Sequence, residues 1–372
     1  MKLAIWMNMP SHHQSGLFDA LRRMGGDVRV TYYQGVTQRR REQGWDTPST
    51  LPEGERILPA DLWALAALED WRERVHIVPG YGSAFTRRLV VELSRQRVSW
   101  LHWSERDRPG LSWLATYPIK AWYARMVNRH ALAALAIGDG AREDFVRWGI
   151  DPSKIRFLPY SGVLPPETGE TDQCVSTFLR ASQPVFMQIG ILNRAKGVDL
   201  LIEAFASVVA SNMKARLVLV GKDESRGAFA KLIRARNLTE LVLLRGPVPA
   251  RSLGSILRAA DVVVLATRFD GWGMALAEGA GYGKALIASD ACGAAVHLIQ
   301  EGQNGFRVPS NDVHALTARM LQYANCPQLA ARHGARSRVI YQEFTPERNA
   351  ERLLTYVSEL MPRMVSGVTR RG

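Results

Sequence analysis

Short apolar runs alternate with segments of helical period along the whole chain. In the first half the runs of strand length are 2–7, 27–33, 75–79, 98–103, 134–137 and 155–159. In the second half they are 184–189, 215–220, 242–244, 261–266, 285–289 and 305–308. Strands that alternate with amphipathic helices are typical of parallel sheets joined by crossover helices. The pattern therefore predicts an α/β protein with two open parallel sheets.

A stretch without period separates the two halves. Residues 159–172 are rich in Pro, Gly and acidic side chains, which is the composition of a linker. We therefore expect one Rossmann-like domain over 1–165, a second over 166–345, and a C-terminal helix over 346–372 that packs back on the first. Two such units would leave a cleft at the carboxyl ends of both sheets, where α/β folds bind ligands.

Composition narrows the class of protein. Of the 372 residues, 47% are apolar and 22% charged, which is the balance of a folded globular chain and excludes disorder and fibres. No apolar run reaches the roughly 18–20 residues that span a bilayer, and the first residues lack a signal-peptide cleavage pattern, so we expect a cytoplasmic protein. Cys174, Cys292 and Cys326 lie far apart, which predicts neither a disulfide framework nor a zinc site.

The net charge of +13 is spread over the chain. Residues 1–165 carry 23 basic and 17 acidic side chains, a surplus of 6, and residues 166–345 carry 20 and 15, a surplus of 5. Spread charge favours ordinary solvated faces, while a phosphate-rich ligand or an anionic membrane surface stays open as a second interpretation.

Several chemistries are excluded by spacing. No GxGxxG opens a strand–helix unit, and the Walker-like piece that ends at Gly283-Lys284 lacks the first Gly and the Ser or Thr that holds magnesium. No GxSxG, HExxH or Asp-x-Asp pattern occurs. Dinucleotide oxidoreductases, common hydrolases, zinc proteases and metal-dependent sugar transferases of the other major fold are therefore not expected.

Residues 268–283, RFDGWGMALAEGAGYG, combine two acids with a glycine-rich turn. A buried strand ends before this turn, and a helix begins near Gly273, where free amides favour an anion or a sugar oxygen. Asp270 and Glu278 are eight residues apart and could bind hydroxyls of two different sugars. The alternative is that Asp270 is a helix N-terminal acid and Glu278 a solvated helix residue.

This segment resembles the carboxylate-pair signature of the retaining glycosyltransferases of family 4, which have the GT-B fold. Residues 190–197, GILNRAKG, are similar to the phosphate loop of that family, and Gly221-Lys222-Asp223 is similar to its next turn. Ser289-Asp290 with Gly293, and Asn304-Gly305, match the downstream spacing. The first half fits more loosely, through 136–150 and 155–163.

The resemblance implies roles for individual residues. Glu278 would hold the ribose hydroxyls of the nucleotide, Asp270 would face the transferred sugar, and Lys196 would neutralise the diphosphate. The implied donor-binding residues are Gly190, Gly271, Trp272, Gly273, Met274, Glu278, Gly246 and Val248. The implied catalytic residues are His102, Asp270, Lys196 and Arg194.

The sequence departs from the family pattern at three places. Ile191 stands where members often carry Arg, so we expect Arg194 to substitute for that cation, and Asp270 is one methylene shorter than the usual Glu. The first loop has side chains in place of a Gly pair, which makes Ser11, His12 and His13 candidate acceptor-binding residues; the alternative is that the two histidines are loop and helix-cap residues. His102, near the predicted end of strand 98–103, would touch the sugar, or else be a core residue.

The resemblance implies a metal-independent hexosyltransferase that retains the anomeric configuration. The donor implied is a nucleotide-diphosphate-sugar of the UDP or GDP type, held mainly by the second domain. The acceptor implied is a glycan, a lipid-linked glycan or a lipopolysaccharide bound by the first domain. No obligatory cofactor, metal or nucleic acid is expected. A nucleotide-sugar epimerase or a phosphorylase on the same fold, and a polyanion- or nucleic-acid-binding protein, are the alternatives.

An anionic membrane surface is a further candidate partner. Residues 83–129 mix basic and aromatic side chains in a way that suits a lipid headgroup layer. The basic ones are Arg87, Arg88, Arg95, Arg97, Lys120, Arg125 and Arg129, and the aromatic ones are Phe85, Trp113, Trp122 and Tyr123. The alternative is that Trp113, Trp122 and Tyr123 belong to the core of the first domain.

Overall fold

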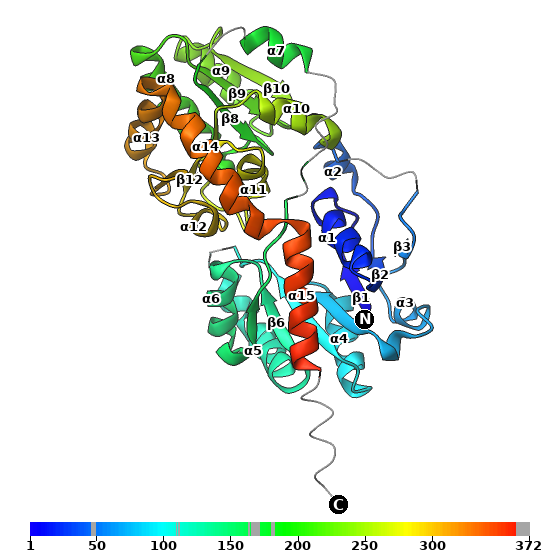
Figure 1. Cartoon of the computed structure of the whole chain (residues 1–372). Helices are drawn as coiled ribbons and strands as arrows, with labels where there is room; N and C mark the ends of the chain where they lie inside the picture. Colours follow the sequence, from blue (N-terminus) through cyan, green and yellow to red (C-terminus); the bar gives the residue numbers. More distant parts are fainter. Residues whose placement is uncertain are drawn as a thin grey trace, which may run out of the picture. The chain divides into compact units, whose positions relative to one another are not determined.

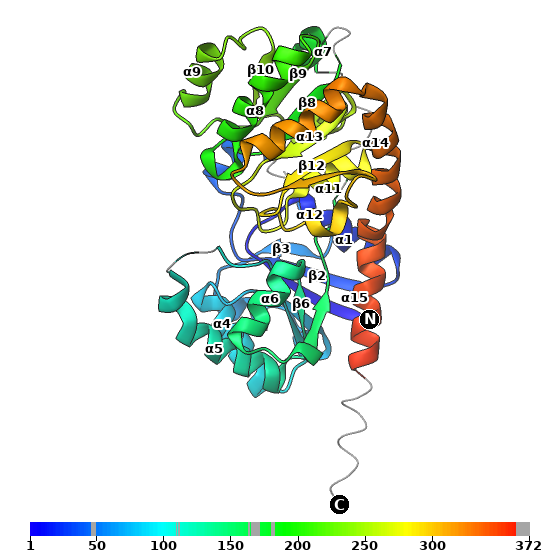
Figure 2. The same cartoon turned by 90° about the vertical axis from the view of Figure 1, so that its left-hand side faces the viewer.

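The computed structural model describes residues 1–45, 50–108, 110, 112–162, 164, 172–179 and 183–361. The chain forms two compact units (Figures 1 and 2). The first unit contains Met1–Thr37, Thr47–Ser161 and Pro346–Gly372, and the second contains Gln38–Asp46 and Gly162–Thr345. Each unit is therefore assembled from segments that are far apart in the sequence.

The first unit is built on a parallel sheet of seven strands in the order β3-β2-β1-β4-β5-β6-β7. The strands are β1 (Lys2–Met7), β2 (Asp27–Tyr32), β3 (Glu55–Ile57), β4 (Val75–Pro79), β5 (Trp100–Ser104), β6 (Ala133–Ala136) and β7 (Ile155–Phe157). Neighbouring strands are in continuous register, as in the pairing of Lys2–Met7 with Asp27–Tyr32. The inner strands β1, β4, β5 and β6 are almost wholly buried, as expected for a parallel sheet covered on both faces.

Helices cover both faces of this sheet (Figure 2). They are α1 (His12–Arg23), α3 (Trp63–Ala66), α4 (Ala84–Arg95), α5 (Ser112–His130), α6 (Asp139–Trp148) and α15 (Pro346–Leu360), with short 3₁₀ turns at Trp71–Glu73 and Pro152–Lys154. Helix α15 packs against α1, where Arg23 contacts Glu347 at 2.5 Å. The buried Asn349 side chain also donates to the Pro159 carbonyl at 2.8 Å.

The second unit contains a parallel sheet of six strands in the order β10-β9-β8-β11-β12-β13. The strands are β8 (Val185–Ile189), β9 (Arg216–Val220), β10 (Val242–Gly246), β11 (Val262–Leu265), β12 (Ala285–Ser289) and β13 (Gly305–Val308). Around them lie α2 (Gln38–Glu42), α7 (Gln173–Leu179), α8 (Val198–Ser211), α9 (Ala228–Ala235), α10 (Leu253–Arg258), α11 (Met274–Gly281), α12 (Ala295–Leu298), α13 (Val313–Asn325) and α14 (Pro327–Tyr341), with 3₁₀ turns at Arg194–Lys196, Ala250–Ser252 and Gln342–Phe344.

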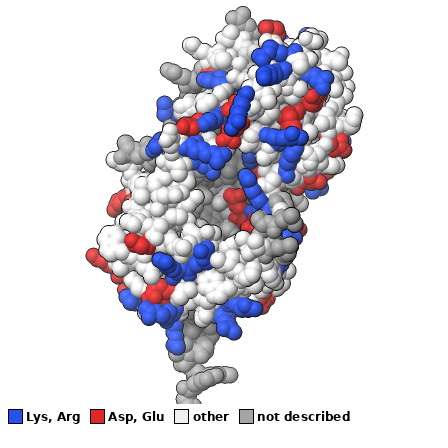
Figure 3. Space-filling model, turned by 180° about the vertical axis from the view of Figure 1, so that it is seen from behind, with Lys and Arg blue, Asp and Glu red and all other residues white. Residues whose placement is uncertain are grey.

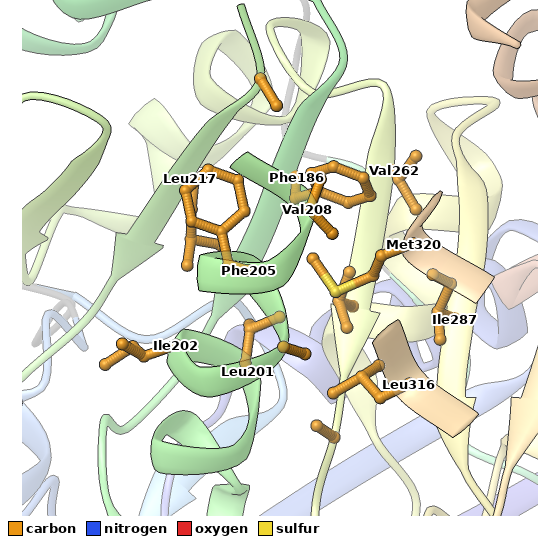
Figure 4. Close-up of a cluster of buried hydrophobic side chains, with 14 of the residues drawn as sticks. Phe186, Leu201, Ile202, Phe205, Val208, Leu217, Val262, Ile287, Leu316 and Met320 are labelled. Atoms are coloured by element: carbon orange, nitrogen blue, oxygen red, sulfur yellow. The ribbon is translucent and has the colours of Figure 1, made fainter. Parts of the chain in front are cut away.

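Helix α8 forms one side of the main core of the second unit (Figure 4). Its buried side chains recur at helical spacing, which places them on one face above the sheet. The labelled residues of this core are Phe186, Leu201, Ile202, Phe205, Val208, Leu217, Val262, Ile287, Leu316 and Met320. Phe205 is fully buried and lies edge-on to Phe186, with ring centroids 6.2 Å apart.

The expectation of an α/β fold with two parallel sheets is confirmed. All twelve predicted strands form, most within two residues of their predicted ends. Strand β3 was not predicted, because its three residues, Glu55–Ile57, have no buried member and carry no apolar run. Helix α2 lies in the second unit although it is encoded near the start of the chain.

No described helix is both long enough and apolar enough to cross a membrane. The longest described helix, α5, has 19 residues, which include Lys120, two arginines and the helix-interior Pro118. This observation concerns only the residues that the structure describes.

Phe205→Ala should destabilise the second unit by about 3–5 kcal/mol, because a fully buried aromatic side chain is replaced by a cavity. Urea unfolding followed by circular dichroism measures the change. Val339→Ala in α14, where the side chain is 57% exposed, is the control and should shift the free energy of unfolding by less than about 0.5 kcal/mol. Equal effects of both substitutions would contradict the packing described for α8.

Candidate donor-binding site

Three loops of the second unit follow the carboxyl ends of neighbouring strands. They come after Ile189 of β8, Val220 of β9 and Leu265 of β11. Because β8 lies between β9 and β11 in a parallel sheet, these loops meet at one edge. This edge is where open α/β sheets bind ligands.

The loop after β8 is a turn that fixes the backbone of Lys196. Asn193 caps the 3₁₀ turn Arg194–Lys196, and its side-chain oxygen accepts from the Lys196 amide at 3.0 Å. Gly197 follows with φ of +67°, and a Cβ at this position would lie 1.8 Å from the Ala266 carbonyl oxygen. Only glycine therefore lets the turn approach the end of β11 this closely.

Hydrogen bonds connect this turn to the loop after β11. The Ala195 carbonyl accepts from the Arg268 amide at 2.8 Å and from the Thr267 hydroxyl at 3.0 Å. The Arg268 guanidinium donates to both oxygens of Asp199 at 2.7 and 2.8 Å. The Arg194 side chain is 85% exposed, and its distance to Asp199 is 3.9 Å. The Arg194 side chain therefore extends away from the turn, with its guanidinium in solvent.

Lys196 and Asp270 form an ion pair within the site. The Lys196 Nζ lies 2.5 Å from Asp270 Oδ2, and the two side chains are 28% and 18% exposed. A predicted diphosphate-binding cation and a predicted sugar-facing acid, 74 residues apart, are thus in direct contact. Partial burial makes such a charge-assisted hydrogen bond stronger than one in open solvent.

The glycine-rich turn leads into α11 as the sequence predicts. Gly273 is the N-cap of the helix, with φ of +104°. The backbone of Asp270 is fixed on both sides, since its amide donates to Ala291 and its carbonyl accepts from Gly293, both at 3.1 Å. The helix α11 then directs its first amides, beginning near Met274, toward the same edge as Lys196.

Cys292 packs beneath this turn. Its thiol donates to the Trp272 carbonyl at 3.2 Å and is fully buried. Burial, together with the nearby charge of Asp270, raises the pKa of the thiol to about 12. Cys292 is therefore a neutral packing residue under the glycine-rich turn.

Glu278 and Trp272 are both buried, at 2% and 1% exposure. The alternative of a solvated Glu278 is therefore wrong: the side chain lies on the covered face of α11. A buried carboxylate requires polar partners, which is consistent with a binding role and does not by itself assign one.

Gly246 and Val248 lie at the end of the neighbouring strand β10. The Gly246 carbonyl accepts from the Gly221 amide at 2.9 Å, which ties this strand end to the loop after β9. The loop after β9 is in turn bonded to the phosphate turn, since the Leu192 amide donates to the Lys222 carbonyl at 2.9 Å. The structure thus places Gly190, Gly246 and Val248 in consecutive loops of one sheet edge.

In the first unit, Ser11 caps helix α1. Its hydroxyl accepts from the His13 amide at 3.3 Å, which supports a structural role for this residue. His12 and His13 are the first two residues of α1, are half-buried, and have ring centroids 3.8 Å apart. The acceptor-binding role predicted for them stays a prediction.

His102 lies in the centre of the first sheet and not at a strand end. Strand β5 extends to Ser104, so His102 pairs with Val78 on one side and Ala134 on the other. The ring is fully buried, Nδ1 lies 3.1 Å from the Tyr123 hydroxyl and Nε2 lies 2.9 Å from Ser104 Oγ. Burial lowers the pKa of His102 to about 3. This geometry favours the core-residue alternative, and direct contact with a sugar has no support in it.

Three residues at the site escaped the sequence analysis. Asn193 carries a local signal, because Asn is a common N-cap residue that accepts a hydrogen bond from the amide three residues later, here that of Lys196. Glu224 and Arg268 carry no local signal. Their partners, Asn193 and Asp199, are 31 and 69 residues away.

The comparisons with known proteins agree with this arrangement. Residues 172–339 match the model of the glycosyl transferases group 1, and residues 10–161 match that of a glycosyl transferase 4-like domain. The chain belongs to this glycosyltransferase family. Together the two matches cover both units of the fold.

Two curated relatives illustrate the family. Alpha-D-kanosaminyltransferase of Streptomyces kanamyceticus is 27% identical over 199 residues, which are 52% of this chain and 51% of that protein. The lipopolysaccharide core biosynthesis mannosyltransferase LpcC of Rhizobium leguminosarum bv. viciae is 29% identical over 203 residues, 53% of this chain and 56% of that protein. The match thus spans about half the length of these two curated relatives.

Solved structures of the family show the fold. Anabaena HepE, crystallised with UDP, matches with a TM-score of 0.77 at 16% identity over 96% of this chain and 100% of that one. WaaG, a glycosyltransferase of lipopolysaccharide biosynthesis, matches with a TM-score of 0.65 at 16% identity over 94% and 98%. These likenesses show the GT-B fold for this glycosyltransferase.

Acid should destabilise the first unit partly through His102. The unfolded chain binds a proton on this imidazole below about pH 6.5, whereas the folded chain keeps it neutral until about pH 3. The stabilisation is therefore complete above pH 6.5 and is lost as the pH falls, by roughly 1.4 kcal/mol per pH unit. Urea unfolding at pH 6, 5 and 4 measures how steeply the free energy of unfolding falls with pH. This dependence should be weaker for His102→Gln than for the wild type, while His130→Gln, at an exposed position, should keep the wild-type dependence. Identical slopes for both variants would contradict the burial of a neutral His102.

Proposed function

We propose that this family 4 enzyme transfers a sugar from a nucleotide-diphosphate-sugar, with retention of the anomeric configuration, to a glycan or lipopolysaccharide-type acceptor. The observation that carries the proposal is the ion pair of Lys196 with Asp270 at the edge that also holds the N-terminus of α11. A cation, an acid and free amides at one edge suit a diphosphate next to a sugar.

The leaving diphosphate is the difficult charge in such a transfer. In the proposed reaction, Lys196 and the first amides of α11 stabilise this charge, so that no metal ion is needed. Asp270 accepts hydrogen bonds from hydroxyls of the transferred sugar, and Glu278 binds the ribose. The acceptor hydroxyl attacks from the face that the diphosphate leaves, and its proton passes to the leaving phosphate oxygen.

A hexose carried on UDP is the donor that we infer. HepE was crystallised with UDP, with UDP and glucose, and with UDP-glucose, and its fold covers almost the whole of this chain. Base recognition would fall to the backbone around Gly246 and Val248, since Gly246 ends β10 at the same sheet edge and Val248 lies in the loop after it.

The acceptor is proposed to be a lipid-linked glycan or lipopolysaccharide. Support comes from the similarity to LpcC and WaaG, which both act in lipopolysaccharide biosynthesis. The charge distribution favours this over a general polyanion-binding role. On the face that Figure 3 shows, Lys and Arg side chains are interspersed with Asp and Glu, so this face has no single-sign field.

Fewer of the predicted membrane-binding residues between 83 and 129 are exposed than the sequence suggests. Phe85, Lys120 and Tyr123 are buried, and Lys120 pairs with Asp107 at 2.6 Å, so these three cannot face lipid. Trp113 lies outside the residues whose side chains the structure describes. Three predicted members, Arg87, Arg88 and Trp122, line a groove of about 490 Å³ together with Leu62, Val91, Glu92 and Ile119.

This groove mixes apolar and basic side chains. Val91 is 43% exposed, and the adjoining Trp63 and Tyr117 are 62% and 42% exposed. Aromatic side chains beside arginines suit the headgroup layer of an anionic leaflet. We therefore assign peripheral attachment to α3, α4 and the first half of α5.

Donor binding is tested with substitutions in the second unit. Glu278→Gln should raise the dissociation constant for UDP by about 10- to 150-fold, the equivalent of 1.5–3 kcal/mol for one charge-assisted hydrogen bond. Lys196→Ala should weaken UDP and UDP-sugars alike. Asp270→Asn should lower turnover while UDP binds at least as tightly, because the diphosphate no longer meets a carboxylate beside Lys196.

Isothermal calorimetry and sugar-transfer assays separate these effects. Lys231→Ala, at an exposed position of the same unit, is the control and should match the wild type. Normal UDP binding by both Glu278→Gln and Lys196→Ala would remove this sheet edge from the donor site.

Membrane attachment is tested by co-sedimentation with vesicles that contain or lack phosphatidylglycerol, at low and high salt. Arg88→Glu should reduce pelleting with anionic vesicles at least about 5-fold, since one cation near such a surface contributes about 1 kcal/mol. Lys231→Glu makes the same change of charge in the second unit and should leave pelleting unchanged. A wild-type protein that stays in the supernatant under all conditions would point to a soluble acceptor.

A further inference from the structure

Residues 38–45 form a segment of the second unit that the chain inserts from its N-terminal half. We call it the strap. It consists of α2 and the turn after it, where the Gly44 and Trp45 amides donate to the Arg41 and Arg40 carbonyls. In Figure 1 this short helix has the blue colour of the chain's start, unlike the elements of the second unit that surround it in the fold.

Two ion pairs join the strap to the loop after β9. Arg39 donates to Glu224 at 3.1 Å, and Glu42 pairs with the Lys222 ammonium. Exposed pairs of this kind contribute little stability, with a median near 0–1 kcal/mol. We therefore expect these ion pairs to place the strap beside the loop after β9 more than to stabilise the fold.

Glu224 connects the strap to the phosphate turn. Besides Arg39, it accepts from the Asn193 side chain at 3.2 Å, and Asn193 in turn caps the Lys196 amide. Burial raises the pKa of Glu224, but hydrogen bonds from Asn193 and Arg39 outweigh that effect and hold the pKa below its ordinary value. A continuous series of contacts thus runs from Arg39 through Glu224 and Asn193 to Lys196.

The far end of the strap lies against the loop after β10. A Cβ at Gly44 would lie 2.4 Å from the Val248 carbonyl oxygen, and Gly44 has φ of +88°. Only glycine fits at this contact. Next to it, the Arg40 guanidinium stacks over the Trp45 ring at 4.6 Å from the centroid. The strap therefore contacts both the loop after β9 and the loop after β10.

We propose that the strap is a wall of the nucleotide site and that Glu224 and Gly44 are positioning residues for the nucleoside diphosphate. This inference rests on the proposed donor site. Glu224 sets the phosphate turn through Asn193, and Gly44 sets the edge of the base-binding loop at Val248. The ligand class is a nucleoside diphosphate, whose phosphates and base would lie at the two contacts.

The experiment uses the full chain with three probes: UDP, UMP and inorganic pyrophosphate. Glu224→Ala should raise the dissociation constants for UDP and pyrophosphate about 5- to 10-fold, because the phosphate turn loses its support. Glu224→Gln keeps an acceptor for Asn193 and should recover most of the affinity. Gly44→Ala should weaken UDP and UMP by a similar factor and leave pyrophosphate unchanged. For Glu224→Ala and Gly44→Ala the donor KM should rise while kcat stays within about 2-fold, and for Glu224→Gln the donor KM should stay close to that of the wild type.

The controls separate this effect from general damage. Arg236 and Glu203 form a matched exposed pair elsewhere in the second unit, at 2.8 Å, and Arg236→Ala should bind all three probes like the wild type. Thermal unfolding of each variant checks that the fold is intact. As a second measurement, hydrogen exchange of the Gln43, Gly44 and Trp45 amides in the wild type should slow on saturation with UDP.

The results distinguish the two proposals. If the wild type binds neither UDP nor pyrophosphate, the donor site itself is wrong. If the wild type binds UDP while Glu224→Ala and Gly44→Ala bind it equally well, or if the strap amides do not respond to UDP, only the role of the strap is overturned. Equal loss of UDP and pyrophosphate binding in Gly44→Ala would overturn the assignment of Gly44 to the base.

Discussion

The carbonyl of Ala195 is the point on which the site of the second unit depends. It accepts two hydrogen bonds from the loop after β11, from the Arg268 amide and the Thr267 hydroxyl, and so joins that loop to the phosphate turn. The Arg268 guanidinium strengthens this connection, since it donates to both oxygens of Asp199 just after the phosphate turn. Because the backbone of Lys196 is fixed here, its side chain is already oriented toward Asp270, with Nζ 2.5 Å from Oδ2. Preorganisation of this kind means that little rotamer entropy remains to be lost when an anion binds.

The fold could be predicted from the sequence because both sheets are buried and parallel. Such strands are apolar along their whole length, so they stand out between amphipathic helices. The short edge strand β3 has no buried residue, and no pattern in its three residues could show it. The turn at Gly273 and the helix after it were predictable for a local reason, since two glycines lie in the loop between a buried strand and a helical pattern.

The site was only partly predictable, because two kinds of information are absent from a local motif. His102 has the same neighbours in sequence whether its ring faces a ligand or the core. The rings of Tyr123 and Phe145 that pack on it come from α5 and α6, and only the folded chain brings them there. Glu224 and the strap show the second kind. Arg39 of the strap is 185 residues from Glu224 in the sequence, and only the folded chain shows that they belong to the same unit. The resemblance to family 4 singled out Lys196 and Asp270, but not the residues that orient them.

The placement of helix α15 has a consequence for synthesis on the ribosome. This helix covers α1 in the first unit, yet it is encoded after the whole second unit. At about 5–20 residues per second, the roughly 185 residues between Ser161 and Pro346 take about 10–40 s to translate. During that interval the first sheet can form, while the surface of α1 that α15 will cover stays open to water. The nascent first unit therefore depends on α15 to complete it, and a ribosome that stalls before Pro346 would release a protein with this surface exposed.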